Sequence, residues 1–209
     1  MRIIFNNQIN HTSFQASLVK FDDDKKPKIG RYVPEENIYE TTDVNLVRFN
    51  PLDKNDLDTL DRIANSWVDD IFSVNIYNNA NDIYEKKQKN RNFVPFRDFI
   101  YGLTTQKDNF EKLDYRKVLG LCDGRLIDEK KIYMSHLQIN PEYVYSSLAV
   151  FQSKPFEYKG IGSAIVNALK NMYSSIELSS RREESVRRFY IKNGFTNIPD
   201  SLTRFIWKI

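Results

Sequence analysis

The sequence predicts an α/β (α+β) domain in which a mixed, mostly antiparallel twisted sheet is flanked by helices and preceded by an N-terminal β extension. Short segments of alternating apolar and polar residues indicate strands, and longer segments with apolar residues three and four apart indicate helices. Three strand-like segments, 97–105, 117–127 and 132–139, follow one another without a long helix between them. Such a succession is typical of an antiparallel meander.

Length and composition set limits on the domain organisation. The 209 residues are 41% hydrophobic, with 14 Phe and 12 Tyr, which suffices for a sizeable core in one elaborated domain. We therefore predict an extension over residues 1–43 and a main domain over residues 44–209. The one cysteine, Cys122, excludes an internal disulfide, and we interpret it as core filling in a reducing compartment.

Charge and hydropathy exclude several classes of protein. The net charge of +3 does not by itself indicate a nucleic-acid partner. Two histidines and one cysteine cannot supply a four-ligand metal site, so no metal is predicted. No segment has the roughly 20 consecutive apolar residues that cross a bilayer, and no signal-peptide pattern is evident. We expect a cytoplasmic protein without a membrane partner.

The first half of the chain predicts strands followed by two helices. Residues 1–43 are expected to form a strand pair and a loop, with one strand at 13–21 and a charged turn at 22–28. A strand at 44–49 and helices at 56–68 and 69–89 are expected to follow. Asp53 or Asn55 is placed to cap the first helix, because short polar side chains accept hydrogen bonds from its first N–H groups.

The strand at 132–139 and the connection after it bear on function. Simple alternation assigns His136 to one face of the strand; the other face then carries Tyr133, Ser135, Leu137 and Ile139. In the preceding strand, Asp123-Gly124 is a turn or bulge signal. Because the following connection is long, residues 141–158 are expected to form a loop or extra hairpin that walls a substrate site. Residues 148–151 offer an alternative strand.

The last third of the chain contains a glycine-flanked turn at the start of a strongly amphipathic helix. Gly160 and Gly162 lie on either side of Ile161, where the helix begins. The free N–H groups and the dipole of a helix N-terminus favour a phosphate there. A strand at 175–179, a helix at 181–190 with Gly194 as its C-cap, and a strand at 201–209 are expected to follow.

Two motifs together resemble the GNAT acyltransferase superfamily, whose members use acetyl-CoA or a related acyl-CoA. Its phosphate-binding signature is Gln/Arg-x-x-Gly-x-Gly/Ala; Gly160 and Gly162 match it, and Glu157 departs from it at the first position. A later helix of the superfamily often ends in Phe-Tyr-x-x-x-Gly-Phe, which residues 189–195 match, whereas Glu183 stands where an Asn often opens that helix. The resemblance is firm over residues 117–209 and extends from residue 44.

The resemblance implies roles for particular residues. The strand at 132–139 would splay from its neighbour, admit the pantetheine of acetyl-CoA and polarise the thioester carbonyl through a backbone N–H. The glycine turn would bind the diphosphate, and Tyr190 would protonate the departing thiolate. The implied cofactor-binding residues are Leu137, Gln138, Ile139, Lys159, Gly160, Ile161, Gly162, Ser163 and Ala164.

The sequence offers several candidates for the base that deprotonates the acceptor amine. GNAT enzymes use a carboxylate, a histidine or a water chain, so the candidates are Tyr133, His136, Glu142 and Glu177. His136 has a suitable side chain, and a structural histidine is the alternative interpretation. Tyr190, His136 and Tyr133 form the predicted catalytic set.

We therefore expect an N-acetyltransferase that transfers an acetyl group from acetyl-CoA to a primary amine. The acceptor would be a small molecule, a peptide or a protein, and aminoacyl-tRNA is the one nucleic acid considered. A homodimer is a further expected partner. The alternative is a module on the same fold that binds acyl-CoA or another protein without catalysis.

Overall fold

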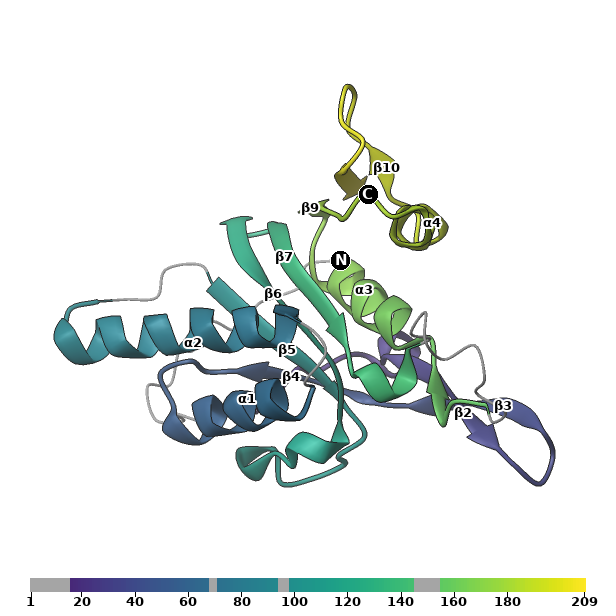
Figure 1. Cartoon of the computed structure of the whole chain (residues 1–209), viewed down its shortest axis with the longest axis horizontal. Helices are drawn as coiled ribbons and strands as arrows, with labels where there is room; N and C mark the ends of the chain where they lie inside the picture. The colour runs from purple at the N-terminus through teal and green to yellow at the C-terminus, as the bar shows by residue number, and fades with distance from the viewer. Residues whose placement is uncertain (1–15, 68–70, 94–97, 145–154) are drawn as a thin grey trace.

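The main sheet of the computed structural model, which describes residues 16–67, 71–93, 98–144 and 155–209, has the strand order β1-β4-β5-β6-β7-β9-β11-β10 (Figure 1). Neighbouring strands in it are antiparallel except β7 and β9, which are parallel. Its strands are β1 (Ser17–Leu18), β4 (Asn45–Phe49), β5 (Asp98–Thr104), β6 (Val118–Asp128), β7 (Lys131–Ile139), β9 (Ser175–Ser179), β10 (Thr196–Asn197) and β11 (Arg204–Lys208). The predicted fold class is confirmed.

Hydrophobic cores cover both faces of this sheet. Helices α1 (Lys54–Ser66) and α2 (Ile71–Lys89) pack on one face, and α3 (Ile161–Met172) packs on the other with Tyr190 of α4 (Glu184–Lys192). Leu46 and Val47 are adjacent in β4 and both 0% exposed, yet they belong to different cores. Since successive strand residues point to opposite faces, β4 is buried on both sides.

The N-terminal extension contributes to two sheets. Strand β1 pairs with β4 at the edge of the main sheet. Strands β2 (Lys28–Val33) and β3 (Ile38–Asp43) form a hairpin that extends away from the main sheet (Figure 1). Strand β8 (Tyr158–Lys159) pairs with β2, which completes a second sheet of order β3-β2-β8. The hairpin, whose strands the sequence analysis did not place, therefore supports the segment that enters α3.

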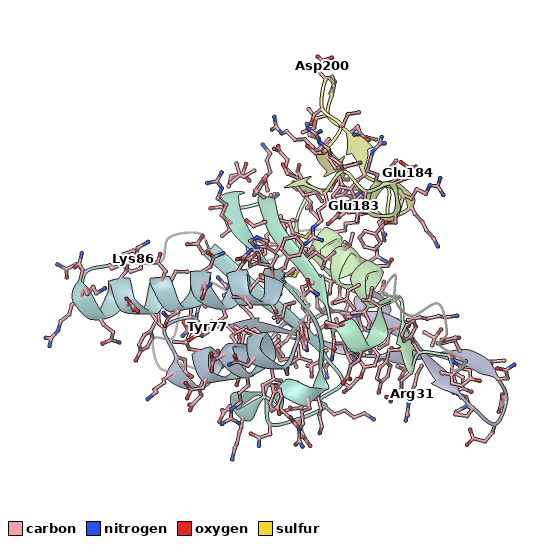
Figure 2. All side chains as sticks on the ribbon, viewed as in Figure 1. Arg31, Tyr77, Lys86, Glu183, Glu184 and Asp200 are labelled. Atoms are coloured by element: carbon pink, nitrogen blue, oxygen red, sulfur yellow. The ribbon has the colours of Figure 1, made fainter. Side chains whose placement is uncertain are left out.

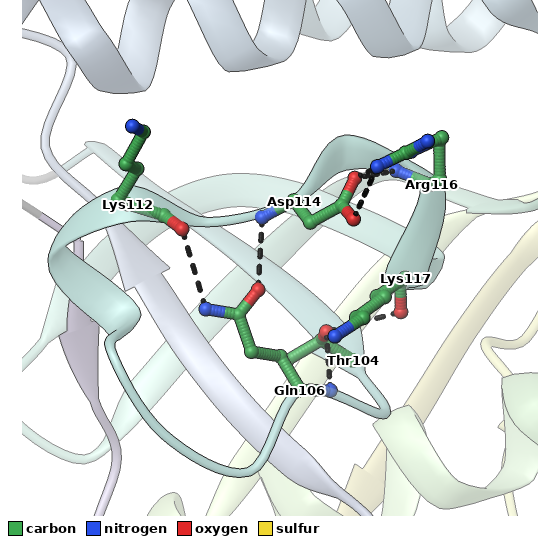
Figure 3. A network of polar contacts seen from close by, with 6 residues as sticks. All are labelled: Thr104, Gln106, Lys112, Asp114, Arg116 and Lys117. Carbon is green, nitrogen blue, oxygen red and sulfur yellow. Dashed lines mark hydrogen bonds and ion pairs between the residues drawn. The ribbon is translucent and has the colours of Figure 1, made fainter.

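The polar connection between β5 and β6 is ordered around one buried side chain, Gln106 (Figure 3). Its Nε2 donates to the carbonyl oxygens of Asp108 and Asn109, both at 2.8 Å, and its Oε1 accepts from Asp114 N–H at 2.8 Å. Short 3-10 turns at Phe110–Lys112 and Tyr115–Lys117 fill the rest of the loop.

Element ends differ modestly from the predictions. Helix α4 begins at Glu184 instead of residue 181, and the expected C-terminal strand is shorter and pairs with β10. Gly194 follows α4 with a φ of 75°, as predicted for a glycine C-cap. The alternative strand at residues 148–151 lies outside the described residues. Among the helices that are described, none has the length and apolar character of a membrane span.

Helix α1 begins with a cap and a buried carboxyl. The Asp53 side chain accepts from the N–H groups of Asn55 and Asp56, so the predicted cap is confirmed. Asp56 is 3% exposed, and its two oxygens accept from Ala16 N–H at 3.0 Å and Asn50 N–H at 2.7 Å. Burial raises the pKa of Asp56 to about 7, although the two backbone hydrogen bonds act in the opposite direction.

Asp56 is expected to make stability depend on pH. Because its pKa in the folded state lies above the ordinary value of 3.8, the folded chain binds more protons than the unfolded chain between these values. The free energy of unfolding should therefore fall as pH rises towards 7, by up to about 1 kcal/mol per pH unit from this group. Urea unfolding between about pH 5 and 8 measures the slope, and Asp56→Asn should flatten it. Asp58→Asn, at an exposed position of the same helix, is the control; equal slopes in both variants would contradict the assignment.

Candidate active site

A cavity lies where β7 and β9 separate. The two strands pair over residues 131–134 of β7 and not over its second half. A cavity of about 650 Å³ occupies the opening, lined by the second half of β7, residues 179–181 after β9, the inner face of α4 and Phe72 of α2. This volume lies within the usual range of small-molecule sites. The splay predicted for this strand is confirmed.

A β-bulge in β7 decides which side chains face which side of the sheet. Gly124 of β6 is opposite Met134, and Asp123 is opposite His136, so Ser135 is an extra residue in the ladder. The bulge reverses the alternation. Tyr133 and His136 consequently lie on the same face, that of α2. The predicted assignment of Tyr133 to the face opposite His136 is therefore wrong.

The backbone of β7 offers a hydrogen-bond donor to the cavity. Asn140 N–H donates to Leu119 O of β6 at 2.9 Å. Since backbone groups alternate in direction along a strand, the N–H groups of Leu137 and Ile139 point away from β6, towards the opening. Leu137, Gln138 and Ile139 all line the cavity, as expected of cofactor-binding residues.

Helix α3 begins with a left-handed residue and no side-chain cap. Gly160 has a φ of 80°, which favours glycine, and a Cβ added there would meet no described atom within 4 Å. The Ala164 N–H donates to Gly160 O at 2.9 Å as the first helical bond. The preceding N–H groups, those of Ile161, Gly162 and Ser163, have no helical acceptor and form the arrangement that binds an anion.

Gly162 packs this helix end against two residues that line the cavity. A Cβ at Gly162 would lie 3.1 Å from Ile139 Cδ1 and 3.1 Å from the ring of Phe189, and both of these residues line the cavity. The glycine therefore permits close packing of α3 against β7 and α4. The sequence analysis explained both glycines by the binding of a diphosphate. The structure adds close packing as a reason for glycine at position 162 and a left-handed backbone as a reason for glycine at position 160.

Lys159 and its strand are held by the extension. Lys159 is opposite Gly30 in the β2–β8 ladder, and its ammonium lies 3.7 Å from the centre of the Tyr39 ring, a cation–π contact. Arg31, opposite Tyr158 in the same ladder, lies on the hairpin side of the molecule (Figure 2). The extension therefore contacts the lysine that precedes the α3 turn.

Tyr190 projects from α4 into an aromatic cluster at the cavity wall. It is 8% exposed and lies 5.0 to 5.7 Å, centroid to centroid, from the rings of Phe189, Phe195 and Phe205. Burial raises the pKa of its hydroxyl well above the ordinary value. Among the described residues the hydroxyl makes no side-chain hydrogen bond, and Tyr190 lines the cavity. It therefore keeps its proton at neutral pH and can donate it to a group in the cavity.

His136 is fixed by neighbours on two elements. Its Nδ1 lies 2.8 Å from Asp123 Oδ1, and its ring centroid lies 5.3 Å from that of Phe72. Asn79 Nδ2 donates to the other oxygen, Asp123 Oδ2, at 3.0 Å. The sequence analysis noted Asp123 only as a bulge signal and missed this contact, which the pairing of β6 with β7 creates.

The other candidate bases lie in different places. Glu142 lines the cavity at the end of β7. Tyr133 and Glu177 are opposite each other in the paired half of β7 and β9 and do not line the cavity.

Two charged residues lie near the start of α4. Arg181 lines the cavity and places its guanidinium 4.3 Å from the centroid of the Phe72 ring. Glu183 lies at the N-terminus of α4 without capping it by a side-chain hydrogen bond (Figure 2).

Two further sequence expectations concern sulfur and metal chemistry. Cys122 is 0% exposed in the core, and burial raises the pKa of its thiol, which fits the interpretation as core filling. Over the described ranges, three or more side chains of His, Cys, Asp or Glu do not gather where they could hold a metal ion.

Among known proteins, similarity to this chain is found in solved structures. No protein-family model matches the chain, and no curated protein matches its sequence. A putative GNAT-family acetyltransferase from Desulfovibrio desulfuricans is 11% identical, with 79% of this chain and 98% of that chain covered and a TM-score of 0.45. The N-acetyltransferase PseH of Campylobacter jejuni, in complex with acetyl coenzyme A, is 11% identical over 79% and 98% of the two chains, with a TM-score of 0.42. Ard1 from Thermoplasma volcanium is 16% identical over 78% and 94%, with a TM-score of 0.40.

Proposed function

We propose that this protein is an N-acetyltransferase that uses acetyl-CoA and acts on a primary amine. The observation that carries the proposal is one cavity, lined by the splayed half of β7 and by the buried Tyr190, with the uncapped N-terminus of α3 packed behind two of its lining residues. Gly162 links these parts, because it packs the α3 turn against Ile139 and Phe189 of the cavity wall. The resemblance of the two sequence motifs to GNAT enzymes agrees with this arrangement.

The proposed acetyl-CoA would lie along these elements in one orientation. The N–H groups of residues 161–163 would hold the diphosphate, because they lack helical acceptors and carry the positive end of the helix dipole. The pantetheine would lie along the open edge of β7. The N–H of Leu137, which points into this opening, would donate to the thioester oxygen as negative charge develops on it.

The reaction then requires two proton transfers. The acceptor nitrogen attacks the thioester carbon, the new C–N bond forms and the C–S bond breaks. His136 Nε2 takes the proton that the nitrogen loses. The Tyr190 hydroxyl gives its proton to the sulfur, so that CoA leaves as a thiol. Proton exchange with solvent returns both side chains to their starting protonation states, and the products are an amide and CoA.

Acetyl transfer is tested by mixing the purified full chain with acetyl-CoA and a panel of amines, and measuring free thiol and product mass. The expected result is thiol release that depends on one class of amine. Calorimetric titration of acetyl-CoA in the absence of amine is the companion measurement. Binding without transfer to any amine would favour the non-catalytic alternative, and no binding at millimolar acetyl-CoA would contradict both.

A further inference from the structure

We propose that Asp123, held in place by Asn79, is a positioning residue that directs Nε2 of His136 into the cavity as the base for the acceptor amine. The inference rests on the proposed acetyl transfer and concerns how its base is selected and oriented. Neither of the two motifs that resemble GNAT enzymes contains Asp123 or Asn79. Their role follows from contacts between β6, β7 and α2.

The carboxylate of Asp123 is fixed at both oxygens. One oxygen faces His136 Nδ1 at 2.8 Å and the other accepts from Asn79 Nδ2 at 3.0 Å. The Asp123 side chain is 6% exposed and that of His136 is 21% exposed. A buried carboxylate with both oxygens engaged cannot turn away, so it holds the Nδ1 proton.

The ring of His136 is left with one nitrogen for chemistry. Because Nδ1 faces β6 and the ring lines the cavity, Nε2 on the far side of the ring is the basic nitrogen available there. Phe72 restrains the ring from α2. Phe72 and Asn79 are seven residues apart on α2 and so share one helix face, which contacts both members of the pair.

The bulge at Ser135 makes this arrangement possible. Without the extra residue, His136 would share the face of Met134, which packs in the core beneath α3. With it, His136 lies opposite Asp123 on the α2 side. Bulges commonly re-aim side chains beside active sites. The cofactor elements α3 and Tyr190 belong to the other face, so the amine would approach from the α2 side.

Asp123→Asn tests the positioning role. An amide at this position no longer favours the proton on Nδ1, so kcat is expected to fall by about 100-fold or more. Acetyl-CoA affinity and the KM for the amine should change by less than about twofold, because neither ligand contacts Asp123. His136→Gln should cause the same loss, and the double variant should lose no more than either single variant. Unchanged kcat in Asp123→Asn would overturn the inference.

Asn79→Ala provides a milder variant that keeps the carboxylate. It should reduce kcat by roughly tenfold, because Asp123 loses one of its two restraints. Asn78→Ala, the neighbouring exposed position of α2, is the matched control and should retain native kcat. A loss of stability without a loss of kcat in Asn79→Ala would show a purely structural pair.

Nitrogen NMR of the imidazole gives a readout that does not need activity. The sequence has two histidines, so His11→Gln leaves His136 as the only signal. The expected spectrum shows the proton on Nδ1 in the native pair and its loss in Asp123→Asn. A proton on Nε2 in an active chain contradicts this inference alone. A proton on Nδ1 in a chain that acetylates no amine contradicts the proposed function, and with it the role of His136 as base.

Discussion

Ser163→Asp is expected to weaken acetyl-CoA binding by at least about tenfold without destabilising the fold. Ser163 is in the first turn of α3, where three backbone N–H groups lack helical acceptors and would hold the diphosphate. A carboxylate there repels the phosphates at short range. The same carboxylate interacts favourably with the helix dipole, so the free energy of unfolding should stay constant or rise by up to about 1 kcal/mol. Loss of affinity in a variant that is as stable as the native chain can then be assigned to the binding turn.

Position 163 is preferable to Gly162 for this experiment. A side chain at Gly162 would meet Ile139 and Phe189 at about 3.1 Å, so a substitution there would disturb packing and binding together. Asn167→Asp, one turn further along α3 at an exposed position, introduces the same charge away from the turn and is the control. Calorimetric titration of acetyl-CoA and thermal unfolding of the three proteins give both quantities. Equal affinity in all three would show that the phosphates bind elsewhere.

The sequence predicted most of the fold because local patterns determined most of it. The cap at Asp53, the helix after Gly160 and the strand pairs of the meander are each encoded by nearby residues. The β2–β3 hairpin was not located, since its turn at residues 34–37 has no glycine and Ile29 is the one buried residue of its two strands. A surface hairpin carries little of the apolar alternation by which strands are recognised.

The candidate site was predictable only in part, and the reason is the pairing of strands. The cofactor turn and Tyr190 lie in contiguous motifs, which a single sequence displays. The contact between His136 and Asp123 depends on which residue of β6 lies opposite His136, and a bulge of one residue changes that answer. Simple alternation placed Tyr133 on the wrong face for the same reason. Asn79 comes from α2, whose packing on the sheet no short motif encodes.

Tyr190→Phe is expected to reduce kcat by about 100-fold while leaving acetyl-CoA affinity unchanged. The substitution keeps the aromatic ring among Phe189, Phe195 and Phe205 and removes only the hydroxyl. Because that hydroxyl makes no hydrogen bond to the described residues, its loss should change the free energy of unfolding by less than about 0.5 kcal/mol. The raised pKa of Tyr190 further predicts that this group causes no alkaline loss of activity below about pH 10.

Tyr173→Phe is the matched control, because it should give the opposite pattern. Its hydroxyl lies 3.0 Å from that of Tyr101 and borders no part of the cavity. Removing it should cost about 1 kcal/mol of stability and leave kcat intact. Steady-state kinetics and urea unfolding of both variants separate the two effects. Native kcat in Tyr190→Phe would mean that water, rather than this tyrosine, protonates the departing thiolate.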